Sequence, residues 1–77
     1  MLKTIKNYIY DKDFRILIIN NQLNINNYKQ VKTIDSSFIE IEYDNKLLTV
    51  RGRDLVLTKI LNDELLIEGI INKIEMG

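Results

Sequence analysis

Apolar and polar residues alternate along most of the chain from residue 14 onward, and this two-residue period is that of β-strands. Short runs rich in Asn, Asp, Ser and Gly interrupt the alternation and are typical of turns. The expected strands cover residues 14–19, 23–26, 28–34, 38–43, 46–51, 55–61, 65–68 and 70–76. Residues 14–19 are apolar on both faces, so we expect them to form a central strand. The pattern predicts an all-β fold: a small single domain of antiparallel hairpins, arranged as a barrel, roll or sandwich of about seven strands.

The segment of residues 38–51 gives the clearest local prediction. Asp44 and Asn45 suit a two-residue turn in which both residues need positive φ. A slip by one residue would exchange the apolar and polar faces, so the alternation fixes the register. The expected pairs are Tyr43 with Lys46, Ile41 with Leu48 and Ile39 with Val50 on one face, and Glu40 with Thr49 and Phe38 with Arg51 on the other.

Two glycines follow this hairpin. Gly52 marks a bend or bulge at which a side chain would obstruct the chain. Residues 62–64 are expected to form the turn of a second hairpin, and Gly69 interrupts its return strand.

Residues 1–13 differ from the rest of the chain. Leu2, Ile5 and Ile9 fall at helical spacing with Lys3 and Lys6 between them, which predicts a short N-terminal helix or arm. This segment could pack on the domain, or its basic amphipathic face could contact a membrane or a partner. We therefore divide the chain into an arm of residues 1–13 and a β domain of residues 14–77.

The composition excludes the commonest catalytic and metal-binding groups. The chain of 77 residues has no Cys and no His, so it offers no disulfide, thiol nucleophile, imidazole base or zinc site of the usual kind. The three glycines form no phosphate-binding loop, and we expect no cofactor. The longest apolar run, residues 16–19, is far too short for a transmembrane segment, and no secretory core follows Met1. The expected location is cytoplasmic.

The one concentrated basic spot is Arg51-Gly52-Arg53. Two arginines at a glycine bend could grip a phosphate or an acidic partner, because they offer forked donors beside exposed backbone amides. The alternative interpretation is a charged bulge that protects a sheet edge.

Four apolar residues fall on the faces opposite the predicted core. If these side chains lie outside, a protein partner or a second copy of the chain should cover them. The candidate interface residues are Leu17, Ile19, Phe38 and Leu47.

A nucleic-acid-binding small barrel that uses Arg51, Arg53, Lys29 and Lys32 is the alternative function. The 11 basic and 11 acidic residues give zero net charge, so we do not expect the protein to bind nucleic acid. Paired carboxylates such as Glu40 and Glu42 are best explained as the solvated face of a strand. We therefore expect that the protein is not an enzyme.

Several runs of sequence resemble the YabP/YqfC family of sporulation proteins, and within it the YqfC branch. These runs are RILIINN (15–21), LNINNYK (23–29), LLTVRGRDLVL (47–57) and LLIEGIINKI (65–74). The last run resembles the family's ending of leucine, isoleucine, acid, glycine, any residue and isoleucine. The resemblance covers about residues 14–76.

The resemblance implies a small protein made in the mother cell of endospore-forming Firmicutes, without known enzymatic activity. The family's genes commonly neighbour one for a larger sporulation membrane protein, YqfD. This implies a role at the membrane around the forespore, through protein contacts. The shared positions are apolar or glycine, so they identify a fold, and no functional residues carry over.

Overall fold

The computed structural model of the protein describes residues 14–77 as a set of antiparallel strands. The predicted arm or helix of residues 1–13 lies outside the described residues. The strands join in a single sheet of order β1-β2-β6-β5-β4-β3, which confirms the all-β fold of antiparallel hairpins. Their bounds are β1 (Arg15–Ile19), β2 (Gln22–Asn26), β3 (Gln30–Ile34), β4 (Phe38–Tyr43), β5 (Lys46–Ile60) and β6 (Glu64–Met76).

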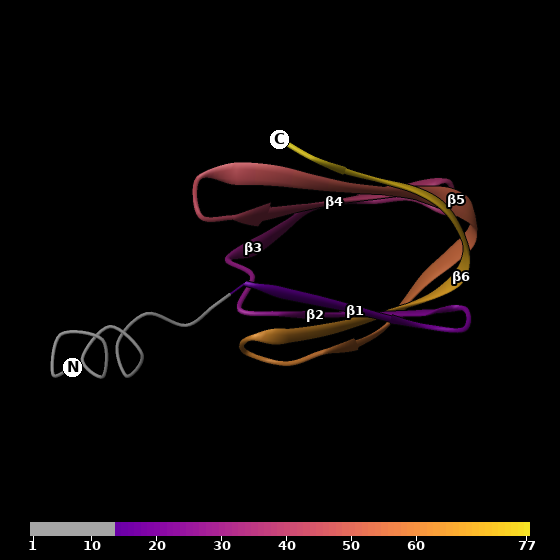
Figure 1. Cartoon of the computed structure of the whole chain (residues 1–77), viewed down its shortest axis with the longest axis horizontal. Helices are drawn as coiled ribbons and strands as arrows, with labels where there is room; N and C mark the ends of the chain where they lie inside the picture. The colour runs from indigo at the N-terminus through magenta and orange to yellow at the C-terminus, as the bar shows by residue number, and fades with distance from the viewer. Residues whose placement is uncertain (1–13) are drawn as a thin grey trace, which may run out of the picture.

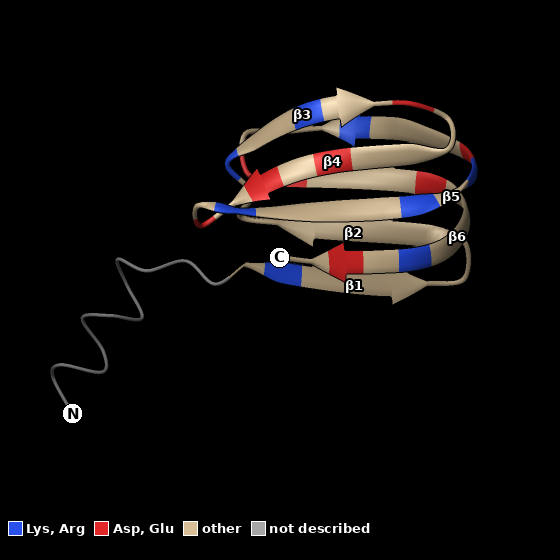
Figure 2. Ribbon diagram, turned by 90° about the horizontal axis from the view of Figure 1, so that it is seen from above, with Lys and Arg blue, Asp and Glu red and all other residues tan. Residues whose placement is uncertain are grey.

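The sheet is folded over so that its two halves face each other as layers (Figure 1). The upper layer contains β3, β4, the first part of β5 and the last part of β6. The lower layer contains β1, β2, the first part of β6 and the last part of β5. The two ends of the sheet, β1 and β3, lie on opposite sides of the molecule when it is seen from above (Figure 2). The sheet is therefore open, and the arrangement is a sandwich made from one sheet.

Two long strands, β5 and β6, carry the chain from one layer to the other. Each contains one of the internal glycines, and each bends there without ending. Residues 14–77 therefore form six strands rather than the predicted number of about seven. A β-carbon on Gly52 would lie 1.9 Å from the carbonyl oxygen of Ile70, and one on Gly69 would lie 2.6 Å from that of Asp54. The two paired backbones approach each other so closely at the bend that only glycine fits, as predicted for Gly52.

The loop between β3 and β4 supports this bend. The backbone N–H of Gly52 donates to the carbonyl of Ser37 over 3.0 Å, and that of Leu55 donates to Ser36 over 2.9 Å. The loop itself is held by the carboxylate of Asp35, which accepts hydrogen bonds from the backbone N–H and the hydroxyl of Ser37. This local bonding positions the two carbonyls that accept from amides of β5.

The hairpin of β4 and β5 has the predicted register, from Tyr43 opposite Lys46 to Phe38 opposite Arg51. Its turn residues Asp44 and Asn45 have φ angles of 47° and 61°, as a two-residue turn of this type requires. The turn at residues 61–63 also follows β5, where the backbone N–H of Leu61 donates to the carbonyl of Glu64. Local alternation and turn chemistry therefore determine the β4–β5 hairpin, whereas the pairing of the β5–β6 hairpin shifts register between Leu57 and Lys59.

The core lies between the two layers and consists of aliphatic side chains with one tyrosine. The ring of Tyr43 stacks on Phe14, with 4.0 Å between the ring centroids. The packing of these side chains from both layers excludes water from the inner faces. The buried residues are Leu23, Ile25, Ile39, Ile41, Tyr43, Leu48, Val50, Leu55, Leu65 and Ile67.

The prediction that residues 14–19 form a central strand is wrong, because β1 lies at an edge of the sheet. Leu17, Ile18 and Ile19 are each about half exposed. The apolar character of both faces does not reflect burial on two sides within the chain. It leaves an edge strand with exposed apolar side chains.

Candidate interaction surfaces

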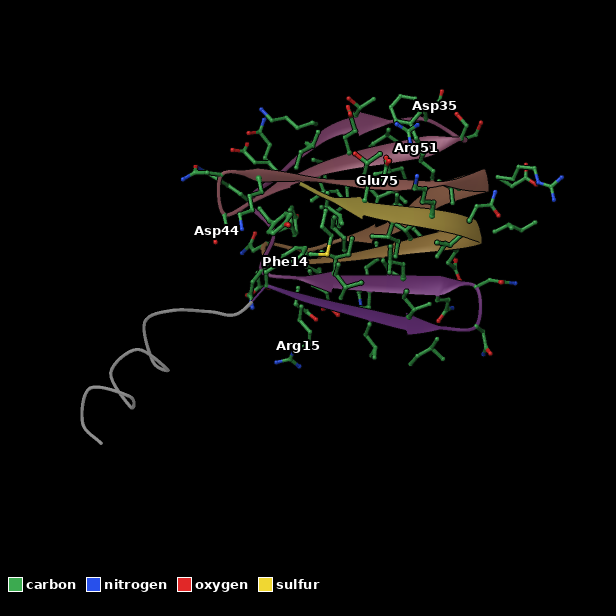
Figure 3. All side chains as sticks on the ribbon, turned by 45° about the horizontal axis from the view of Figure 1, so that its top comes forward. Phe14, Arg15, Asp35, Asp44, Arg51 and Glu75 are labelled. Carbon is green, nitrogen blue, oxygen red and sulfur yellow. The ribbon has the colours of Figure 1, made fainter. Side chains whose placement is uncertain are left out.

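Arg51 is held in place on the outer face of the upper layer. Its Nε atom lies 2.9 Å from a carboxylate oxygen of Glu75, and its guanidinium lies 5.9 Å from the centroid of the Phe38 ring (Figure 3). The β4–β5–β6 register brings the three residues together from positions far apart in the sequence. Lys73 adds a second contact to the same carboxylate, with 3.4 Å between Nζ and Oε2. The hydrogen bonds from Arg51 and then Lys73 lower the pKa of Glu75, because both stabilise its charged form.

The four cations considered for nucleic-acid binding do not form one basic patch. Arg51 is paired with Glu75, and Nζ of Lys32 lies 3.5 Å from a carboxylate oxygen of Glu42. Arg53 is exposed at the bend of β5, and Lys29 is exposed ahead of β3. Basic and acidic residues are interspersed over the strands of this layer (Figure 2). Within residues 14–77 these four cations therefore form no basic groove of the kind that tracks a nucleic-acid backbone.

The four candidate interface residues lie on two different surfaces. Leu17 and Ile19 point outward from β1 on the lower layer, with 50% and 55% of their surface exposed. Phe38 and Leu47 lie on the outer face of the upper layer, since each directly precedes an inward-facing buried residue of its strand. Phe38 is partly covered by Arg51, and Leu47 is 39% exposed. The structure thus brings together only Leu17 and Ile19.

A shallow depression of about 380 Å³ accompanies Leu17 and Ile19 on the lower layer, and we call this surface the lower outer face. Leu66 of β6 also lines this depression. It lies in the same row of the sheet as Leu17, because Asn24 of β2 pairs with Leu17 on one side and with Leu66 on the other. The sequence analysis missed Leu66. Its place depends on the pairing of β2 with β6, which are about 40 residues apart, and no local pattern signals that pairing. The depression is lined by Leu17, Ile19, Gln22, Asn24, Glu64 and Leu66.

Two amide–carboxylate hydrogen bonds supply the polar part of the lower outer face. The side chain of Asn24 donates to Glu64 over 2.8 Å, and that of Gln22 donates to Glu68 over 2.7 Å. Each bond joins β2 to β6 and fixes side chains that would otherwise rotate freely. The lower outer face therefore combines exposed apolar side chains of β1 and Leu66 of β6 with ordered polar groups of β2 between them, and protein interfaces contain both kinds of group.

The described residues offer little for chemistry. Residues 14–77 contain no group of three or more side chains suited to holding a metal ion, and no helix among them could span a membrane. The carboxylate of Glu42 is engaged by Lys32, and Glu40 projects from the same strand face. Nothing in this part of the chain pairs two carboxylates as an acid and a base would require.

The model of the YabP family matches residues 11–77. The chain belongs to the YabP family. The match covers all of the described strands. Membership of the YabP family is consistent with a sporulation-related role, and the family is not a known enzyme family. No curated protein and no solved structure matches the chain.

Proposed function

We propose that this YabP-family chain is a non-catalytic sporulation protein of the YqfC branch that acts through protein–protein contacts in the mother cell. Its partner is a sporulation membrane protein such as YqfD, and the chain lies at the periphery of the membrane around the forespore. The observation that supports this function is the lower outer face, where the exposed Leu17 and Ile19 line a depression together with Leu66.

The lower outer face suits a docked protein better than a small ligand. The depression is open and shallow, whereas pockets for small molecules enclose most of the ligand surface. Leu17 and Ile19 lie two residues apart on one strand, so their side chains stand next to each other on the same face. Apolar side chains of a partner can contact Leu17, Ile19 and Leu66, while the amides of Gln22 and Asn24 on the strand between them meet polar groups.

The proposal is tested by capture of the tagged protein from its sporulating host during engulfment, with identification of the proteins recovered. The double variant Leu17→Thr/Ile19→Thr removes both apolar side chains of β1 from this face and places threonine, a β-branched residue that suits a strand, at each position. The matched control, Ile34→Thr/Ile60→Thr, changes two equally exposed apolar residues elsewhere in the sheet.

We expect the wild type and the control to recover a sporulation membrane protein, and the Leu17/Ile19 variant to lose it. Equal recovery by both variants would show that the lower outer face is not the docking surface. Recovery of RNA or DNA alone would overturn the adaptor function and support a nucleic-acid-binding protein, with Arg53 as the first residue to change.

A further inference from the structure

The last part of β6, residues 70–76, pairs with β5 on one side only, because β2 pairs with β6 only as far as Glu68. We call this segment the β6 edge. The backbones of Leu47 and Gly77 exchange two hydrogen bonds, of 3.0 and 3.3 Å. Since antiparallel positions alternate in direction, the N–H and C=O groups of Glu75 face β5 and those of Ile74 and Met76 face away from the sheet. The β6 edge therefore presents backbone donors and acceptors that can pair with another strand.

The charges on the β6 edge are arranged symmetrically about Ile74. Lys73 precedes it, Glu75 follows it, and both side chains lie on the outer face, where they contact each other over 3.4 Å. If a second copy of the β6 edge pairs antiparallel about a two-fold axis at Ile74, Lys73 of each copy lies directly opposite Glu75 of the other. Ile74 then faces its own symmetry mate, and the two residues exchange a pair of backbone hydrogen bonds.

Other registers of the same edge are less favourable. An axis at Lys73 would place two lysines opposite each other, and an axis at Glu75 would place two carboxylates opposite each other. An axis at Met76 would place Glu75 opposite Gly77, which carries no charge. The axis at Ile74 pairs both charges with their opposites and aligns outward-facing backbone groups.

The other free edges of the described sheet lack this self-complementarity. β1 carries only Arg15, β3 carries only Lys32, and the last part of β5, residues 55–60, carries only Lys59. Each of these segments has a single charged residue, so a symmetric pairing offers no opposite charge to it. Register shifts do not separate these edges, because they occur in β3, in the last part of β5 and, at Asn72, within the β6 edge itself.

The two sides of the sandwich differ in how the layers meet. On the opposite side the layers are joined near β3, where the hydroxyl of Tyr28 donates to the carbonyl of Leu61 over 2.7 Å. Beside the β6 edge there is instead an opening of about 290 Å³, to which Ile18, Ile71 and Ile74 contribute apolar side chains. Ile18 is 52% exposed although it points toward the inner face. A strand added to the β6 edge would cover this opening.

We propose that the chain forms a homodimer in which the β6 edges of two copies pair antiparallel about a two-fold axis at Ile74, so that the upper layers become one continuous sheet. The dimer surface is separate from the lower outer face, so this inference does not depend on the proposed function. A seven-residue edge is smaller than the interfaces of tight complexes, so the dimer should dissociate on dilution.

Charge reversal tests the register in purified protein by sedimentation over a series of concentrations. Lys73→Glu sets two carboxylates opposite each other at both symmetry-related positions, and we expect the dissociation constant to rise roughly tenfold. The double variant Lys73→Glu/Glu75→Lys exchanges the two charges and should restore the dimer. Within one chain it also remains compatible with Arg51, which lies directly opposite residue 73. The matched control is Lys32→Glu on the β3 edge, which should leave the dimer unchanged.

Cross-linking tests the position of the axis. The chain has no cysteine, so Ile74→Cys introduces a single thiol, and two copies at the axis lie within the range of a disulfide. Ile34→Cys on the β3 edge is the control, since Ile34 is the more exposed of the two residues. We expect covalent dimers from Ile74→Cys under mild oxidation, and few from Ile34→Cys. A monomer at all concentrations, loss of the dimer in the charge-exchanged variant, or equal cross-linking of both cysteines would overturn the proposal.

Discussion

The substitution Gly52→Ala tests the feature on which the whole fold depends, the close approach of the β5 and β6 backbones at the bend. The added β-carbon would meet the carbonyl oxygen of Ile70 at 1.9 Å and the Cα of Ile71 at 3.2 Å. Backbone atoms cannot rotate away, so the two strands must separate by roughly 1.5 Å before the contact becomes an ordinary one.

The expected cost follows from the hydrogen bonds that such a separation breaks. Two or three backbone hydrogen bonds near the bend would be lost, at about 1 kcal/mol each, and core packing would loosen as well. We expect a loss of about 3 kcal/mol from a total stability of about 4–12 kcal/mol for a domain of this size. This corresponds to a decrease in Tm of about 12–24 °C.

Urea denaturation followed by circular dichroism measures this loss directly. Gly77→Ala is the matched control, because its added β-carbon meets only the carbonyl oxygen of Leu47 at 3.8 Å, an ordinary contact. The control should lie within about 0.5 kcal/mol of the wild type. If Gly52→Ala is equally stable, the two backbones do not cross as closely as described and the reasoning about the bend is wrong.

Three further predictions concern the loop, the turn and the core. Two hydrogen bonds from Ser37 lower the pKa of Asp35, so Ser37→Ala should raise that pKa toward its ordinary value in an NMR titration. Because the folded-state pKa is depressed, the contribution of Asp35 to stability is present above about pH 4 and is lost as the pH falls through the folded value; an unchanged pKa in the variant would contradict this. Asn45→Gly should stabilise the hairpin by about 0.5 kcal/mol, since glycine adopts the observed φ of 61° without strain, and a lower urea midpoint would contradict this. Ile41→Ala should cost about 3 kcal/mol in urea denaturation because Ile41 is fully buried, and a cost below about 1 kcal/mol would place it outside the core.

The sequence predicts best those parts of the fold that depend on neighbouring residues. The register of the β4–β5 hairpin follows from alternation and from a turn whose residues tolerate positive φ, and both signals lie within 14 residues. The need for glycine at position 52 is likewise a local signal. Its atomic cause, the approach of Ile70, becomes visible only when β6 is in place.

The order of the strands and the candidate surfaces could not be predicted in the same way. β1 resembles a central strand because both of its faces are apolar, and only the pairing of β2 with β6 shows that β1 lies at an edge. Arg51 is separated by 24 residues from Glu75, its ion-pair partner. A pattern that treats Arg51 as a free donor therefore misses the neutralising contact.

The presence of β6 in both layers has a consequence for synthesis on the ribosome. β6 is the last of the six described strands to be made. It contributes buried side chains to the lower layer and pairs with the first part of β5 in the upper layer. Hairpins such as β1–β2 and β4–β5 can form as they emerge, but the β1–β2 hairpin has no further strand to pair with until β6 appears. The nascent chain should therefore remain sensitive to proteases until β6 has left the exit tunnel, and then fold in one step.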